Sequence, residues 1–279
     1  MNTAASAARA TYVIGGGRRR RPIDLAELWT YRELLFFLVW RDAKVRYRQT
    51  VLGAAWALVQ PGMTMVVFDV FFGRLARMPS DGVPYRLFAL AALVPWMYFA
   101  TAVAAGAQSL VGQQHLIAKV YFPRLLMPLA AVATPLIDFA IAFVLLLVMA
   151  IWHGVVPGGA IAWIPLYLIL AIATALTASV WTAALNVEYR DVRFVLPFAI
   201  QFWLFATPVA YPASLVPERW RILYGLNPMA TVVEGFRAAM LGTPGPRHMV
   251  IPSILVVAVM LAVGLKYFRR VEGTFADII

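Results

Sequence analysis

The residue types that carry most enzyme chemistry are few and widely separated in this sequence. The three histidines, His115, His153 and His248, stand far apart, and cysteine is absent. No pair of carboxylates and no metal-ligand spacing accompanies them. The sequence therefore offers no catalytic constellation and no metal site.

The three lysines lack the surroundings of a nucleotide-binding loop. Such a loop is a Gly-rich turn that ends in Gly-Lys-Ser/Thr, so that backbone N–H groups and the lysine hold the phosphates. Lys44, Lys119 and Lys266 have no such neighbours. We expect this chain to bind no ATP and no other cofactor.

Two acidic residues interrupt long apolar segments. Insertion of Asp69 or Asp138 near the centre of a membrane helix would cost roughly 2.5–3.5 kcal/mol, so each is a functional candidate by default. Asp69 can approach Arg74, which favours structural pairing, whereas Asp138 lies deeper. A proton relay would need more partners than these two acids.

Phenylalanines recur at helical spacing near residue 200. On a helix with 3.6 residues per turn, one face carries an aromatic stripe with a neighbouring amide, formed by Phe194, Phe198, Phe202, Phe205 and Gln201. Aromatic faces suit C–H contact with a sugar polymer, and the amide can exchange hydrogen bonds with hydroxyl groups. The commoner role of such a stripe is packing against a neighbouring helix or lipid.

The elements that position these residues are predicted to be membrane helices. The chain is 62% hydrophobic and only 13% charged, whereas soluble chains are about a quarter charged. The apolar residues form blocks near the roughly 20 residues that a helix needs to cross a bilayer. We expect an all-α polytopic protein with six spans at residues 52–72, 87–107, 125–152, 161–185, 196–211 and 249–265, of which the fifth is the shortest.

Residues 212–248 are too polar to span a membrane and too apolar for an ordinary loop. Prolines punctuate the segment, and apolar residues recur at helical spacing over about 12 residues, the length of a re-entrant or interfacial helix. We expect a pair of short helices that dips into one face of the membrane. Glu234 and Arg237 lie three residues apart and can pair, which predicts a wet cavity rather than lipid contact. The alternative is an interfacial cap on the fifth span.

Basic residues set the expected orientation. With the N-terminus inside, most of the 24 lysines and arginines lie in the cytoplasm, so both termini are predicted to be cytoplasmic. Residues 1–24 form a basic tail that we expect to be disordered and to lie against anionic lipid headgroups. Residues 25–50 carry an apolar stripe of Leu28, Tyr31, Leu35 and Leu38, which predicts an amphipathic helix in the inner membrane interface. These roles explain the net charge of +11 without nucleic acid.

Several motifs resemble one family of membrane proteins. The sequence is similar to the permeases of type-2 ATP-binding cassette exporters that move polysaccharides and polyol phosphates. The matching elements appear in the expected order from residue 28 to the C-terminus: Arg41-Asp42, residues 46–50, Leu52-Gly53, Trp56, Gln60-Pro61, residues 186–193, Pro208, Tyr211-Pro212, residues 216–220, residues 226–229, Glu234, Phe236-Arg237, Leu241-Gly242, Phe268, Glu272 and residues 275–277.

This resemblance implies that residues 51–279 form a permease domain in the bacterial inner membrane. Two copies of the chain would face each other as a homodimer, and two copies of a separate ATPase would bind ATP and Mg²⁺ beneath them. A lipid-linked polysaccharide of the O-antigen, capsule or teichoic type would pass between the copies. The alternative from another class is a membrane transferase acting on polyprenyl-linked sugars. A passive channel or proton-coupled carrier is the third interpretation, but the sequence lacks an obvious internal repeat and abundant buried charges.

The resemblance also suggests roles for particular residues. The channel candidates are Trp56, Trp96, Phe99, Phe194, Phe198, Gln201, Phe202 and Phe205. The candidates for ATPase coupling lie in two short inner loops and are Gln113, Gln114, Leu116, Ile117, Lys119, Glu188, Arg190, Asp191 and Arg193. Positive-inside charge alone would also explain the basic ones. The candidates for a gate at the outer face are Trp220, Asn227, Pro228, Glu234 and Arg237.

Overall fold

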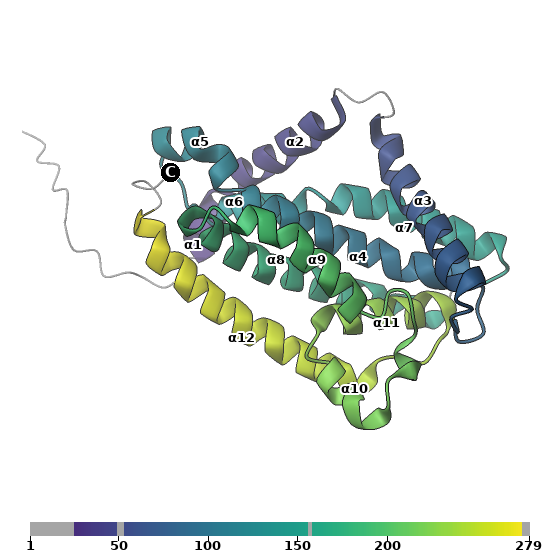
Figure 1. Cartoon of the computed structure of the whole chain (residues 1–279). Coiled ribbons are helices and arrows are strands. Elements are labelled where there is room, and N and C mark those ends of the chain that lie inside the picture. Colours follow the sequence, from purple (N-terminus) through teal and green to yellow (C-terminus); the bar gives the residue numbers. More distant parts are fainter. Residues whose placement is uncertain (1–24, 49–52, 156–157, 275–279) are drawn as a thin grey trace, which may run out of the picture.

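All regular elements in the described part of the chain are helices. The computed structural model describes residues 25–48, 53–155 and 158–274. Its long helices lie side by side in a bundle, with α1, α5 and the end of α12 toward one end and α10 and α11 toward the other (Figure 1). The predicted basic tail, residues 1–24, lies outside the described residues.

Five helical segments in this part of the chain are long and apolar enough to cross a membrane. They are Trp56–Leu75 (α3, Trp56–Phe68, and η2, Asp69–Leu75), Tyr85–Gln108 (α4), Leu126–Trp152 (α6, Leu126–Ala133, and α7, Leu136–Trp152), Gly159–Glu188 (η4, Gly159–Trp163, and α8, Ile164–Glu188) and Arg247–Val271 (α12). The chain is therefore a multi-pass membrane protein.

The predicted fifth span corresponds to the short helix α9, Val192–Ala206, of 15 residues. At 1.5 Å per residue it measures about 22 Å, which is less than the roughly 30 Å of a hydrocarbon core. The expected helix extends to residue 211, but the backbone leaves helical geometry at Thr207. The sixth crossing therefore stays a prediction.

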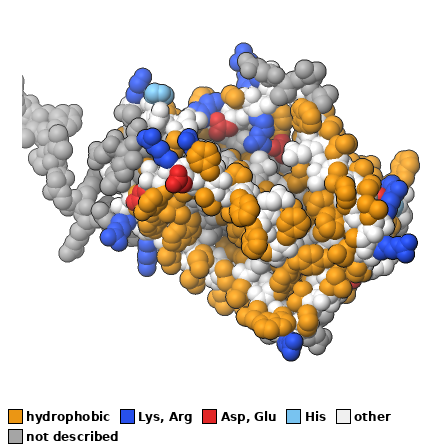
Figure 2. Space-filling view, viewed as in Figure 1, with side chains coloured by type: hydrophobic (Ala, Val, Ile, Leu, Met, Phe, Trp, Pro, Cys, Tyr) orange, Lys and Arg blue, Asp and Glu red, His pale blue; other side chains and the backbone are white. Residues whose placement is uncertain are grey.

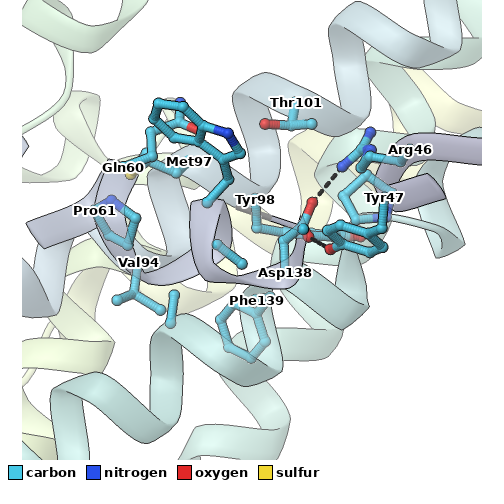
Figure 3. Close-up of a pocket in the computed structure, with 15 residues that line it drawn as sticks. Arg46, Tyr47, Gln60, Pro61, Val94, Met97, Tyr98, Thr101, Asp138 and Phe139 are labelled. Atoms are coloured by element: carbon cyan, nitrogen blue, oxygen red, sulfur yellow. Dashed lines mark hydrogen bonds and ion pairs between the residues drawn. The ribbon is translucent and has the colours of Figure 1, made fainter. Parts of the chain in front are cut away.

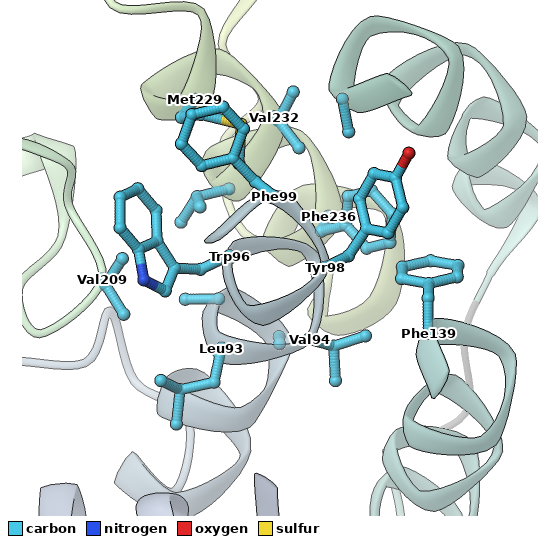
Figure 4. Close-up of a cluster of buried hydrophobic side chains, with 14 of the residues drawn as sticks. Leu93, Val94, Trp96, Tyr98, Phe99, Phe139, Val209, Met229, Val232 and Phe236 are labelled. Carbon is cyan, nitrogen blue, oxygen red and sulfur yellow. The ribbon is translucent and has the colours of Figure 1, made fainter. Parts of the chain in front are cut away.

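Helix α4 lies at the centre of the bundle. It contacts α3, α6, α7, α8, α9 and α11, and its buried side chains include Leu93, Trp96 and Phe99. Figure 4 shows Phe99 beside Met229 and Val232 of α11, with Phe139 of α7 on the other side of α4. The crossing of α4 and α8 is close because Gly106 has no side chain: a Cβ there would lie 2.3 Å from Ser179 Oγ. Small residues at such crossings let membrane helices approach each other.

The N-terminal helices pack against the bundle in a way that corrects the amphipathic prediction. Helices α1 (Leu25–Thr30) and α2 (Arg32–Arg48) place the predicted stripe against residues of α6, α8 and α12, with Leu38 only 1% exposed. The stripe therefore contacts protein rather than lipid. The exposed apolar residues lie elsewhere on these helices, at Trp29, Phe36, Phe37 and Trp40.

Two short helices, α10 (Glu218–Tyr224) and α11 (Pro228–Leu241), separate α9 from α12, as the sequence predicts. Local residues define α11: the side chain of Asn227 accepts a hydrogen bond from Met229 N, Pro228 is the first helical residue, and Gly242 ends the helix with φ 72°. Almost all of α11 is buried against α4 and α8. It is therefore part of the core and not a peripheral cap.

Candidate translocation, coupling and gate sites

The phenylalanine stripe of α9 lies on an exposed face. Phe194, Phe198, Phe202 and Phe205 are 55–74% exposed, and α9 contains no buried residue. The opposite side of the helix packs on the core through Leu196, Ile200, Trp203 and Leu204. Hydrophobic side chains cover much of this side of the molecule (Figure 2). The stripe is thus available to lipid, to a second copy of the chain or to a polymer.

Two predicted channel residues lie in the core instead. Trp96 is 4% exposed and Phe99 is fully buried, and the ring of Phe99 packs edge-on against Trp203 with 4.9 Å between centroids. Such side chains cannot touch a polymer in this conformation. The prediction failed for them because an aromatic residue in a membrane span serves packing as readily as ligand contact. Trp56, by contrast, is 50% exposed.

Trp56 borders a polar pocket between α2, α3, α4 and α7 (Figure 3). At its centre is Asp138, which forms an ion pair with Arg46 and accepts a hydrogen bond from the Tyr47 hydroxyl. Burial and the Asp138 contact raise the pKa of Tyr47 to about 12. The pocket measures about 440 Å³.

The sequence identified Asp138 as unusual but missed both of its partners. Arg46 and Tyr47 lie about 90 residues earlier in the chain and looked like part of a solvated interface helix. The sequence did contain a clue to this pairing. An unpaired acid in a membrane segment is costly, so a cation from another element was to be expected beside Asp138. The other acid, Asp69, pairs as predicted with Arg74, and Arg86 binds the same oxygen at 2.9 Å.

The predicted coupling residues lie at the end of the bundle that carries α1, α5 and the end of α12 (Figure 1). His115, Gln114 and Lys119 on α5 (Gln114–Lys119) are exposed, as are Glu188, Arg190, Asp191 and Arg193 around the turn between α8 and α9, whereas Gln113 is half-buried. Leu116 packs against the buried hydrophobic cluster that also contains Leu38, so its first role is to hold α5 in place. The side chain of Ile117 lies outside the described residues.

The predicted gate residues form a buried cluster at the other end. Arg237 has no exposed surface, pairs with Glu234 at 2.9 Å and stacks over the Phe88 ring at 3.5 Å. It also donates to the backbone carbonyls of Phe88, Pro208, Val209 and Tyr211 at 2.5–3.3 Å. These carbonyls and Glu234 surround the guanidinium, whereas Glu234 also lines a cavity of about 240 Å³ with Ser214 and His248, so the wet cavity stays a prediction.

The remaining gate candidates frame this cluster. Asn227 accepts a hydrogen bond from Trp203 Nε1 at 2.9 Å and donates to Ala206 O and Thr207 Oγ1, which joins the start of α11 to the end of α9. Pro228 is buried, whereas Trp220 on α10 is half exposed. Within residues 25–48, 53–155 and 158–274, no three His, Cys, Asp or Glu side chains gather as metal ligands would.

Comparison with known proteins identifies similar chains. Residues 33–241 match the family described as ABC-2 type transporter. An O-antigen export system permease protein RfbA from Myxococcus xanthus is 32% identical over 214 residues, covering 76% of this chain and 82% of that protein. A protein of the same name from Klebsiella pneumoniae is 26% identical over 251 residues, covering 88% of this chain and 95% of its own length.

Proposed function

Because the chain belongs to the ABC-2 type transporter family, we propose that it exports a lipid-linked polysaccharide of the O-antigen type across the bacterial inner membrane. It is the transmembrane subunit of an ABC transporter, and ATP hydrolysis belongs to a separate subunit. We infer that two copies of the chain and two ATPase subunits, which bind ATP and Mg²⁺, form the working exporter.

The observation that carries this proposal is the exposed phenylalanine stripe in a chain related to O-antigen permeases. Four rings and Gln201 present a long exposed surface, at one end of which Arg193 stacks over the Phe194 ring at 4.6 Å. Aromatic faces contact the C–H faces of sugars with little specificity, so a polymer can slide along them. We infer that the stripe lines a passage between two facing copies.

The buried cluster around Arg237 supports a gate at the outer end of this passage. Residues 207–212 run outside helical geometry between α9 and η5 (Ala213–Leu215), and irregular backbone at membrane depth must find its hydrogen bonds within the protein. Arg237 supplies several of them. We propose that α10 and α11 form a re-entrant pair that borders the exit, with Trp220 at its edge.

A cell that makes the polymer but lacks this chain tests the function. We expect loss of surface polysaccharide and accumulation of lipid-linked polymer inside the cell, with recovery when the chain and its ATPase are supplied together. The chain alone should not restore export. Transfer of sugars to a polyprenyl carrier by the purified chain without an ATPase would contradict the proposal and favour the transferase alternative.

A further inference from the structure

The pocket around Asp138 contains more polar groups than the packing of the helices requires. It is bordered by the end of α2, the first turns of α3, the middle of α4 and the start of α7. In the orientation inferred from the basic residues, these parts lie in the inner half of the membrane. Polar groups at that depth are costly, and they commonly mark the path of a substrate.

The charge of the pocket is balanced. Arg46 is neutralised by Asp138, and the Tyr47 phenol, which donates to the same carboxylate, is uncharged at neutral pH as any tyrosine is. A phosphate would therefore find no net positive charge. A sugar hydroxyl, which both donates and accepts, can donate to the carboxylate and accept from the guanidinium.

Three further side chains face the pocket and can form hydrogen bonds with a ligand. The side chains of Gln60, Thr101 and Trp56 make no hydrogen bond to the described residues. Figure 3 shows Gln60 on the α3 side of the pocket, across from Arg46 and Tyr47, and Thr101 of α4 between them, nearer to Arg46. The half-exposed Trp56 adds an aromatic surface. A volume of about 440 Å³ falls within the usual range for small-molecule sites, about 300–1,000 Å³.

From this combination we propose that the pocket binds an uncharged sugar unit of the lipid-linked glycan on its way into the exporter. The inference rests on the proposed function, because it takes the glycan as the cargo. Asp138, Arg46 and Gln60 bind hydroxyl groups, and Trp56 contacts the apolar face of the ring. The site lies within one chain, apart from the stripe of α9.

Cysteine protection tests the site, since the chain has no cysteine of its own. Ala57→Cys places a thiol in the pocket wall on α3, and Val67→Cys places one on an exposed part of the same helix outside the pocket. Each variant is reconstituted with the ATPase in lipid nanodiscs. Maleimide labelling is then timed with farnesyl-diphosphoryl-N-acetylglucosamine or with farnesyl diphosphate.

We expect the sugar-bearing probe at about ten times its Kd to slow labelling of Ala57→Cys about tenfold, because only empty pockets react. Farnesyl diphosphate should protect little, and Val67→Cys should react equally in all samples. Adding Gln60→Ala or Thr101→Val, which removes a side-chain group that has no hydrogen-bond partner among the described residues, should raise the probe concentration needed for protection.

Equal protection by the two probes would overturn the proposal in favour of a lipid-diphosphate site, and absence of protection would exclude binding in the pocket. Unchanged protection in both added variants would also overturn it. A strain that exports polymer normally while its purified exporter shows no protection would refute the pocket and leave the permease function standing. Loss of the permease function would instead appear in the export assay.

Discussion

At the scale of single residues, Arg237 shows how a charge can lie inside a membrane protein. Its guanidinium satisfies the backbone carbonyls of a non-helical segment and the carboxylate of Glu234, and its plane covers the Phe88 ring. Burial of a charge is tolerated when it is paired and fully hydrogen-bonded. We therefore regard Arg237 as the residue that holds α11, α4 and residues 208–211 together.

Replacing this arginine should destabilise the chain strongly. Arg237→Met leaves Glu234 buried without its cation and several carbonyls without donors, which should cost about 3–5 kcal/mol. Thermal unfolding in detergent measures the effect. The matched control is Arg219→Met, because Arg219 is exposed beside Trp220 and should matter little. Equal unfolding midpoints for the two variants would show that Arg237 does not hold these segments together.

At the scale of elements, the contact between α4 and α8 depends on small residues. Gly106 meets Ser179, whose hydroxyl donates to Ala102 O at 3.3 Å, and two turns further along α8 Asn186 donates to Ala107 O at 2.7 Å. Ala171 and Ala175 are also fully buried. Small side chains let the backbones approach until polar groups of one helix reach the carbonyls of the other.

A single methyl group should disturb this contact. The Cβ of Gly106→Ala would lie 2.3 Å from Ser179 Oγ and 3.1 Å from its Cα, so one helix must move. Overpacking of this kind typically costs about 1–3 kcal/mol. Gly62→Ala on α3 has nothing within 4 Å of the new Cβ and should be neutral or mildly stabilising. The unfolding midpoints of the two variants should therefore shift in different directions or by clearly different amounts.

The aromatic stripe of α9 makes a functional prediction. Phe198→Ser with Phe202→Ser should leave folding nearly intact, since both rings are mostly exposed. Loss of two aromatic contacts, each worth about 0.5–1.5 kcal/mol, should slow export about tenfold. Export is measured as surface polysaccharide per folded exporter. The pair Ile254→Ser with Leu255→Ser on α12 is the control, and equal losses in both pairs would count against a channel role for the stripe.

At the scale of the whole molecule, the two ends of the bundle differ. One end gathers α5, the α8–α9 turn and the C-terminal part of α12, where Tyr267 donates to Glu188 and Arg124 donates to Glu272 O. The other end holds α10, α11 and the Asp69 ion pairs. The excess of basic residues near the first end makes it the predicted cytoplasmic side.

Labelling of introduced cysteines checks this orientation. His115→Cys lies on the exposed side of α5, and Leu215→Cys lies before α10, where Leu215 is 54% exposed. In intact spheroplasts, a membrane-impermeant maleimide should label only Leu215→Cys, and His115→Cys should react after permeabilisation. The opposite labelling pattern would show that the chain has the opposite orientation in the membrane, and the proposed gate would then lie at the inner face.

Contact with the ATPase makes the last prediction. His115→Glu with Lys119→Glu changes two exposed side chains of α5 without touching Leu116, which packs internally. If α5 seats the ATPase, the two changes should raise the Kd of the permease–ATPase complex by about 30-fold, given about 1 kcal/mol for each substitution. Affinity of the purified subunits in detergent measures this. The outer-face pair Arg219→Glu with Arg247→Glu should leave the Kd unchanged, and the same Kd for all three chains would exclude α5 from the interface.

The sequence by itself determined the class of protein, the family motifs, most helix positions and the face on which the α9 phenylalanines lie. Block length, composition and helical periodicity are local properties of the chain. They can be read without knowing which segments pack against each other. Asn227-Pro228 and Gly242 likewise define α11 locally, because caps act within one turn.

The contacts made by each helix face became known only from the packed structure. Trp96 and Phe99 proved to be core residues, the stripe on α1 and α2 contacts protein, and Glu234 and Arg237 are buried. Asp138 finds Arg46 and Tyr47 across some 90 residues. Periodicity tells which side chains share a face, but burial and pairing depend on segments that are distant in sequence and adjacent only after the helices pack.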